Sequence, residues 1–287
     1  MAILNEIQTS PATSGLGLFV DNVDLQMASP QTIAGIRELI FEHGVVFFRG
    51  QTLAPADQIR VAKSLGEIVI NRFFTPVDGH PEIAEVIKEA DQEWAIGENW
   101  HTDHSYDEAP ALGSFLYALE TPPTGGDTCF AGMQAAYDAL PEELRQRIAG
   151  LQARHESEHI FSPSESTRME EASERSDGDY IARATQYPEA IHPIVLEHPE
   201  TGRKGLYVNP EFTTEIIGLS REESDDLLQQ LYDHILQPQF LYHFKWAPGS
   251  IAIWDNRATW HKAMNDYQGH RRHMRRITLA GVSLNSH

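Results

Sequence analysis

Apolar residues spaced three and four apart, as on one buried face of a helix, recur in several stretches of the chain. Ser29 stands before Pro30 in the position of a helix cap, and Ser220 with Glu223 has the spacing of a capping box. These signals mark where helices begin, and Gly44, Gly66 and Gly150 mark the ends of three of them. The predicted helices are Pro30–Gly44, Ala54–Leu65, Pro141–Gly150 and Ser220–Ile235.

Short apolar or alternating runs bounded by glycine and proline turns fill much of the remaining chain, as expected of β-strands. Many short strands at close spacing, with helices mainly in the first part, are typical of an antiparallel sandwich or jelly roll with peripheral helices. We therefore predict a mainly β protein that forms one domain over residues 1–287. The predicted strands are Val45–Phe48, Ile83–Ile87, Gly113–Leu119, Thr128–Phe130, His192–Leu196, Gly205–Asn209, Phe240–Trp246, Ser250–Trp254 and His273–Val282.

One stretch, residues 162–189, lacks this patterning and is rich in Ser, Glu, Asp and Arg. Long loops within compact domains are often functional. Two interpretations stay open for it, a lid that orders over a ligand and a flexible surface loop.

The composition narrows the classes of partner. Lys and Arg number 22 and Asp and Glu 42, so the formal net charge is −20, which argues against nucleic acid or an anionic membrane as a partner. No apolar run approaches the roughly 18 residues of a membrane span, and a single cysteine, Cys129, excludes an internal disulfide framework. We expect a cytoplasmic protein, and any anionic ligand must be held by local cations.

A candidate metal site stands in the middle of the chain. His101 and Asp103 are two apart, so in an extended segment both side chains point to the same side. His261 is a plausible third ligand, just after a predicted strand on the opposite wall. Two imidazoles and one carboxylate with open positions are the ligand set of non-haem Fe(II) oxygenases, although Zn accepts the same groups. Three other histidines are expected to be structural or superficial, namely His43, His104 and His198.

Two arginines follow the third candidate ligand at strand spacing. Arg272 and Arg276 have the same parity and would face the same side of one strand. Guanidinium groups inside a barrel are costly unless anions meet them, and Arg suits the two oxygens of a carboxylate. One Arg for a cosubstrate and one for an acidic substrate would explain the pair, and a solvent-facing pair is the alternative.

Together, the order and spacing of these motifs resemble the taurine and 2,4-dichlorophenoxyacetate dioxygenase family of Fe(II)- and 2-oxoglutarate-dependent oxygenases. The likeness extends from about Gly44 to Gly281. It is carried by Asn99–Asp103, Pro122–Thr128, His198–Arg203, Trp254–Arg257, His261, Arg272 and Arg276.

The resemblance implies a double-stranded β-helix, or jelly roll, in which His101, Asp103 and His261 bind Fe(II). It implies that Arg272 and Thr128 bind 2-oxoglutarate. With O2 as second cosubstrate, such enzymes hydroxylate a small organic acid and release succinate and CO2. Collapse of the product then cleaves a C–O or C–S bond where the hydroxylated carbon bears the heteroatom. Members commonly form homo-oligomers.

The substrate side of the resemblance rests on fewer residues. Arg276 falls on the position that grips the acidic group of a carboxylate or sulfonate. Taurine enzymes carry Asn four residues before the first ligand, where this chain has Gly97, and the remaining motifs favour an aryloxyalkanoate-like acid. Tyr106 and Tyr207 are candidate pocket walls, with core packing as the alternative.

Two other functions compete at this stage. A Zn-dependent hydrolase would use the same three ligands but leaves Arg272 and Thr128 unexplained. A jelly roll that binds small molecules without catalysis would not explain why a complete set of metal ligands is present.

Overall fold

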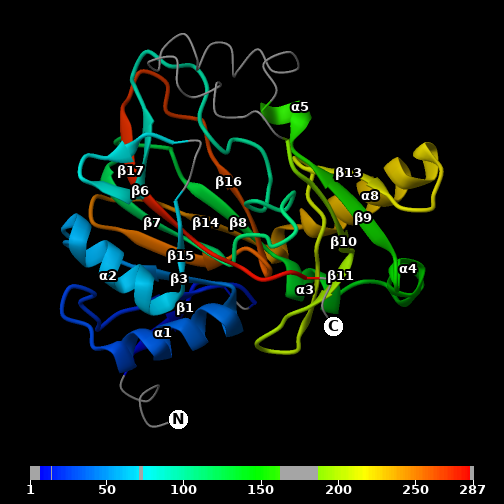
Figure 1. Cartoon of the computed structure of the whole chain (residues 1–287), viewed down its shortest axis with the longest axis horizontal. Coiled ribbons are helices and arrows are strands. Elements are labelled where there is room, and N and C mark those ends of the chain that lie inside the picture. The colour runs from blue at the N-terminus through cyan, green and yellow to red at the C-terminus, as the bar shows by residue number, and fades with distance from the viewer. Residues whose placement is uncertain (1–6, 14, 71–73, 162–186, 285–287) are drawn as a thin grey trace.

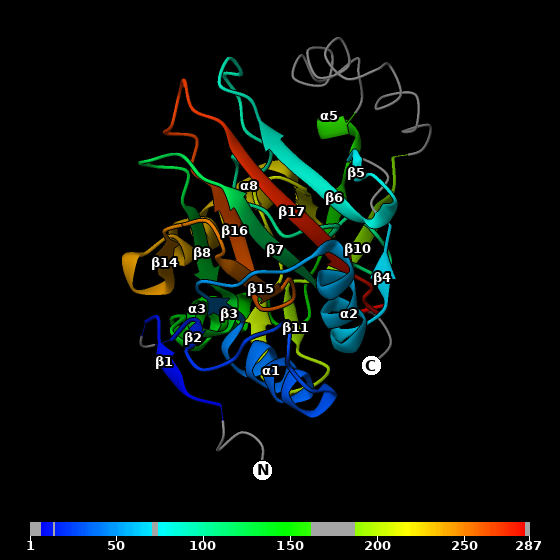
Figure 2. The same cartoon turned by 90° about the vertical axis from the view of Figure 1, so that its left-hand side faces the viewer.

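The computed structural model describes residues 7–13, 15–70, 74–161 and 187–284. Its centre is a nine-stranded sheet in the order β1-β2-β3-β15-β7-β17-β6-β5, with β4 paired to β17, and a three-stranded sheet in the order β14-β8-β16. Figure 2 shows β16 and β8 behind the strands β6, β17 and β7. The large sheet comprises β1 Thr9–Pro11, β2 Leu18–Val20, β3 Val45–Phe48, β4 Ile68–Val69, β5 Pro76–Val77, β6 His80–Lys88, β7 Gly113–Glu120, β15 Ile251–Asp255 and β17 Arg272–Leu279. The small sheet comprises β8 Thr128–Gly132, β14 Leu241–Phe244 and β16 Thr259–Ala263.

Helices and further strands lie around these two sheets, with α1 and α2 on one side and β9, β10, β13 and α8 at the other end of the molecule (Figure 1). A hairpin of β11 and β12 and a sheet in the order β10-β9-β13 complete the fold. The strands are β9 Gln152–Glu156, β10 Glu189–Pro193, β11 Val195–Glu197, β12 Lys204–Leu206 and β13 Thr213–Ile216. The helices are α1 Pro30–His43, α2 Pro55–Leu65, α3 Met133–Asp138, α4 Glu142–Ile148, α5 Glu158–Phe161, α8 Arg221–Ile235 and the 3-10 turn η2 Pro238–Phe240.

The space between the two central sheets is filled by large apolar side chains. Phe130 of β8 and Phe244 of β14 pack with Phe47, Trp254 and Met274 of the large sheet. A second core lies between the large sheet and helices α1 and α2. Two facing sheets with an apolar filling are the arrangement of a jelly roll, so the predicted mainly β fold with peripheral helices is confirmed.

Several details differ from the prediction. The sheets are not wholly antiparallel, because β2 and β3 pair in parallel. The strand predicted over Gly205–Asn209 is wrong in its second half, since β12 ends at Leu206, and the Asn209 side-chain oxygen accepts from Phe212 N in the following turn. The five-residue strands β9 and β16 were not predicted, since so few residues show no clear alternation. Of the stretch 162–189, interpreted as a lid or a flexible loop, residues 162–186 lie outside the described residues, and Glu189 already begins β10.

Within the described part of the chain, no helix is both long enough and apolar enough to cross a membrane.

A buried histidine outside the metal site makes stability depend on pH. Burial, with a smaller effect of His192, lowers the pKa of His155 to about 3. The unfolded chain titrates near about 6.5, so between these values it binds more protons than the folded protein does. The contribution of His155 is therefore complete above about pH 6.5 and falls by about 1.4 kcal/mol per pH unit as the pH falls toward 3.

We expect the free energy of unfolding in urea to fall less steeply between pH 6.5 and 5 in His155→Gln than in the wild type. The difference in slope should approach 1.4 kcal/mol per pH unit, about the effect of one proton. Equal slopes in the two proteins would contradict the assignment of a neutral His155 in the folded state.

Candidate metal centre

Three side chains converge in the space between the two central sheets. His261 lies on β16 of the small sheet, and His101 forms an isolated antiparallel bridge with it. Asp103 does not continue this extended segment as predicted but begins a turn. Ligand atoms of His101, Asp103 and His261 all lie within 4.8 Å of one another. The sequence-predicted triad is therefore brought together by one bridge and one turn rather than by a longer strand.

The hydrogen bonds of His101 determine which of its nitrogens is available. Nδ1 lies 2.8 Å from the carbonyl oxygen of Asn99, which can only accept, so Nδ1 carries the proton. Nε2 faces the triad, 3.6 Å from Asp103 Oδ1, and His261 Nε2 lies 3.5 Å from Asp103 Oδ2. Two imidazole nitrogens and a carboxylate facing one point form a donor set that fits Fe(II).

Protonation at the triad is set by burial and by the neighbouring charges. Burial would raise the pKa of Asp103, but the guanidinium of Arg276 outweighs it and holds this pKa well below its usual range. Burial, followed by the charge of His101, holds the pKa of His261 well below its ordinary value. Asp103 is thus a carboxylate and His261 a neutral imidazole, which are the forms that bind a metal.

Two residues of the large sheet contact the carboxylate of the triad. Arg276 Nη2 of β17 lies 2.5 Å from Asp103 Oδ2, and Ser114 Oγ of β7 donates to the same oxygen at 2.9 Å. Ser114 also accepts from Arg276 Nη2 at 3.0 Å. Arg276 Nε is buried and has no hydrogen-bond partner in the part of the chain that the structure describes. The guanidinium therefore neutralises Asp103 while one edge stays available for an anion.

Arg272, four residues earlier on the same strand, presents a buried charge of a different kind. It is 5% exposed, and its Nε and Nη2 have no hydrogen-bond partner among the described residues. Its Cζ lies 5.8 Å from the ring centre of Trp246, whose Nε1 donates to Thr128 Oγ1 at 3.0 Å. Because the Thr128 oxygen accepts this bond, its own proton can be donated elsewhere. A carboxylate can accept hydrogen bonds from the unpaired Arg272 nitrogens and from the Thr128 hydroxyl, so these residues fit 2-oxoglutarate.

The two tyrosines proposed from the sequence lie in different surroundings. Tyr106 packs edge-on against Phe212 at 4.9 Å, and Phe212 lies 6.4 Å from the ring of His101. Tyr207 instead packs against the rings of His155 and His192, at 5.7 and 5.5 Å. Tyr106 is thus joined to the triad through one aromatic ring, whereas Tyr207 lies in the cluster around His155.

Sequence patterns did not single out three residues that the structure places at the site. Ser114 and Trp246 reach it through strand pairing and sheet facing, which the sequence does not specify. Phe212 follows Asn209 in a turn without periodicity. Ser114 is the polar member of an otherwise apolar strand, and it has the same parity as Leu116 and Ala118, which could have indicated that it faces inward.

Gly97 lies against the first ligand. Its φ is +75°, and a Cβ at this position would lie 3.1 Å from His101 Cε1 and 3.7 Å from Nε2. We expect Gly97→Ala to displace the imidazole and to weaken metal binding by roughly tenfold or more, in the range seen when the surroundings of a ligand change.

Gly150 provides the matched control, since it has the same φ of +75° and no described residue lies within 4 Å of its Cβ position. Both alanine variants carry the same backbone strain, of about 1 kcal/mol, but only Gly97→Ala crowds a ligand. Titration of the apoprotein with Co(II) measures the difference. Equal affinities in the two variants would exclude the steric effect.

Comparison with known proteins extends over nearly the whole chain. The model of the family described as "Taurine catabolism dioxygenase TauD, TfdA family" matches residues 8–278. An alpha-ketoglutarate-dependent sulfate ester dioxygenase of Pseudomonas putida is 34% identical over 278 residues, covering 96% of this chain and 90% of the relative. An alpha-ketoglutarate-dependent 2,4-dichlorophenoxyacetate dioxygenase of Burkholderia sp. (strain RASC) is 31% identical over 281 residues, covering 91% and 90%. A crystal structure of a taurine dioxygenase from Burkholderia xenovorans is 33% identical with a TM-score of 0.78, covering 96% of this chain and 91% of that chain.

Fold, triad and comparisons together define a non-haem iron dioxygenase that depends on alpha-ketoglutarate, which is 2-oxoglutarate. The chain belongs to the taurine catabolism dioxygenase TauD, TfdA family. Its cofactor is Fe(II), and its cosubstrates are 2-oxoglutarate and O2. The predicted family, double-stranded β-helix and reaction class are confirmed, and they are supported over a Zn hydrolase or a non-catalytic binding protein.

Proposed function

We propose that this dioxygenase hydroxylates a small organic acid, with Fe(II) held by His101, Asp103 and His261. One observation carries the assignment of roles: the buried triad lies beside two arginines of β17, one paired with Asp103 and one with unpaired nitrogens. A site that needs two separate anions, a cosubstrate and a substrate, accounts for both arginines.

Bound iron, 2-oxoglutarate and O2 supply the oxidation of a C–H bond, with succinate and CO2 as coproducts. In this proposal Arg272 grips the far carboxylate of 2-oxoglutarate through two parallel hydrogen bonds, and the Thr128 hydroxyl donates a third. Trp246 holds the Thr128 oxygen in place from the other side. The protein thus orients the cosubstrate through groups that are already positioned before it binds.

Arg276 binds the acidic group of the substrate, with Nε donating while Nη2 stays on Asp103. This arrangement holds the substrate's anionic end next to the triad. Tyr106 and Phe212 offer an aromatic wall for its apolar part. Tyr207 has no direct contact with the triad in the described contacts, so its predicted part in substrate binding stays the weaker hypothesis.

We propose a carboxylate, sulfonate or sulfate ester with an alkyl or aryloxy group as the substrate. The named relatives act on a sulfate ester and on 2,4-dichlorophenoxyacetate, and each compound has an anionic group close to a carbon that bears an ether or ester oxygen. Hydroxylation of that carbon gives a product that collapses to a carbonyl and cleaves the C–O bond, or the C–S bond in the case of a sulfonate.

Succinate release from 2-oxoglutarate, measured with an alkyl sulfate, an alkyl sulfonate, an aryloxyacetate and an uncharged ether of matched length, tests this proposal. At least one acid should give succinate and product in equal amounts, and the ether none. Arg276→Gln should raise KM for that acid by roughly 10- to 100-fold, the effect of one charge-assisted bond. Equal turnover of the ether, or an unchanged KM in the variant, would contradict the role of Arg276.

We further propose a cytoplasmic homo-oligomer. Support comes from the single cysteine, which suits a reducing compartment, and from the resemblance to a family whose members commonly associate. Light scattering coupled to size exclusion, at two protein concentrations, tests the oligomeric state, and a monomer at both would contradict it.

A further inference from the structure

The metal ligands come from two segments that are joined at few points. Main-chain bonds connect Ala263 N to Gly97 O at 2.8 Å and pair His101 with His261 at 3.1 and 2.9 Å. Past His101 the chain turns away, with Asp103 at the start of the turn and His104 at a φ of +57°. Arg276 and Ser114 hold the Asp103 carboxylate to the large sheet. A link from this segment to the strand of His261, beyond the bridge, would also fix Asp103 relative to that ligand.

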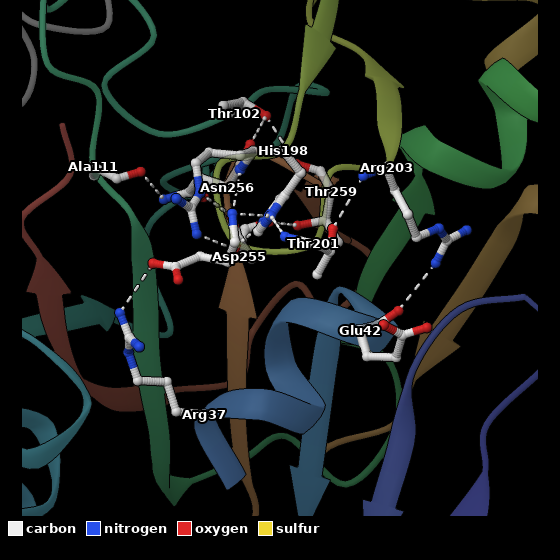
Figure 3. Close-up of polar contacts among 12 residues, drawn as sticks. Arg37, Glu42, Thr102, Ala111, His198, Thr201, Arg203, Asp255, Asn256 and Thr259 are labelled. Carbon is white, nitrogen blue, oxygen red and sulfur yellow. Dashed lines mark hydrogen bonds and ion pairs between the residues drawn. The ribbon is translucent and has the colours of Figure 1, made fainter. Parts of the chain in front are cut away.

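Thr102 supplies such a link. It is 4% exposed, and its hydroxyl lies 2.8 Å from the carbonyl oxygen of Thr259 and 3.3 Å from that of Asn256. Figure 3 shows the Thr102 side chain above the turn that joins β15 to β16, with both contacts drawn. The hydroxyl thus connects the residue between His101 and Asp103 to the start of the strand that carries His261.

The turn that accepts this bond is itself held firmly. Both oxygens of the fully buried Asp255 accept two bonds each, three from Arg257 and one from His198 Nε2 at 2.9 Å. His198 Nδ1 accepts from two backbone N–H groups of its own hairpin turn, so Nε2 carries the proton. A carboxylate with four charge-assisted or oriented donors is a rigid anchor for the residues that follow it.

The Asn256 side chain also connects this turn to Trp254 and to Ala111 by hydrogen bonds. Its Oδ1 accepts from Trp254 Nε1 at 2.9 Å, and its Nδ2 donates to the carbonyl oxygen of Ala111 at 3.3 Å. The Trp254 ring lies 4.7 Å from the ring of His261. Asn256, whose carbonyl oxygen lies near the Thr102 hydroxyl, is therefore bonded to the tryptophan that packs on the third ligand, His261.

We propose that Thr102 is a positioning residue for the metal centre, whose hydroxyl bond to the Asn256–Thr259 turn sets the placement of His101 and Asp103 relative to His261. The inference rests on the proposed ligand roles of these three residues. Groups that orient ligands typically change metal affinity by about 10- to 100-fold when removed. Thr102 points away from the triad, so its effect reaches the metal only through the placement of its neighbours.

Co(II) titration of the apoprotein, read from the visible absorption of the bound ion, tests this placement in four proteins. Thr102→Val keeps the shape of the side chain and removes the hydroxyl, and Thr102→Ser keeps the hydroxyl. Ser224→Ala is the control, because Ser224 Oγ is a buried hydroxyl bonded at 2.8 Å to Ile216 N, remote from the triad on α8. The wild type supplies the reference affinity and spectrum.

Thr102→Val is expected to weaken Co(II) binding by about 10- to 100-fold and to alter the absorption bands. Thr102→Ser and Ser224→Ala should stay within about threefold of the wild type, with unaltered bands. Thr102→Ala replaces the valine variant if that variant does not fold. An affinity of the valine or alanine variant within threefold of the wild type, or an equal loss in Ser224→Ala, overturns the inference. Absence of Co(II) binding in the wild type would instead overturn the proposed ligand set.

Discussion

Arg272→Met is expected to make the ligand-free protein more stable and, at the same time, to remove its response to 2-oxoglutarate. The Arg272 guanidinium is 5% exposed with two unpaired nitrogens, and burial lowers its pKa. Replacing a buried unpaired charge by an apolar chain of similar length should stabilise the fold by roughly 1 kcal/mol or more. The loss of two charge-assisted bonds should raise KM for 2-oxoglutarate by at least about 100-fold.

Arg257→Met is the control for this variant. Arg257 is similarly buried at 4% exposure, but its Nη2 lies 2.6 Å from Asp255 Oδ2. Removing it leaves a buried carboxylate without its main partner, at a cost of roughly 3–5 kcal/mol. Urea unfolding of the apoproteins should therefore shift in opposite directions for the two variants. Destabilisation of Arg272→Met to the same extent as Arg257→Met would show that Arg272 has a structural partner after all.

Asp103→Asn is expected to reduce turnover by at least about 1,000-fold, because metal catalysis supplies several kcal/mol of transition-state stabilisation. The same change should destabilise the apoprotein. Arg276, whose side chain is 11% exposed, loses the carboxylate that neutralises it and keeps only a neutral amide and Ser114. Breaking a buried pair in this way costs roughly 3–5 kcal/mol.

Asp107→Asn is the control for Asp103→Asn, because it removes a negative charge near the triad without removing a proposed metal ligand. Asp107 lies four residues further on, with its side chain 28% exposed and paired to His104 at 3.1 Å. Its variant should keep metal affinity within about threefold of the wild type and lose less than about 1 kcal/mol of stability. Turnover of Asp103→Asn above one-tenth of the wild-type rate would be incompatible with Asp103 as a ligand.

The triad could be predicted from the sequence because two of its three residues lie close together in the chain. His101 and Asp103 are two residues apart, and only the distant His261 had to be added from the resemblance and the strand pattern. The prediction failed in detail where it assumed a strand through Asp103. Asp103 instead begins a turn. The hydrogen bonds that stabilise this turn are made to residues far away in the sequence, and periodicity carries no information about them.

The two arginines of β17 show a second limit of prediction from the sequence. Parity places Arg272 and Arg276 on one face of β17, but the sequence left open whether that face is buried. Pairing of β17 with β7 decides it, because Arg276 lies opposite Leu116 and both belong to the side that faces the small sheet. The partners Ser114 and Trp246 follow from this sheet facing and could not be predicted from spacing alone.

The central claim is that iron and 2-oxoglutarate bind together at the His101–Asp103–His261 triad. Titrating the anaerobic, Fe(II)-loaded wild type with 2-oxoglutarate, and following the weak visible charge-transfer band of the chelate, tests it most directly. The account predicts a band that saturates at one equivalent of 2-oxoglutarate per iron and that needs at least about 100-fold more cosubstrate in Arg272→Met. A folded, iron-loaded wild type without a band at any 2-oxoglutarate concentration would contradict it.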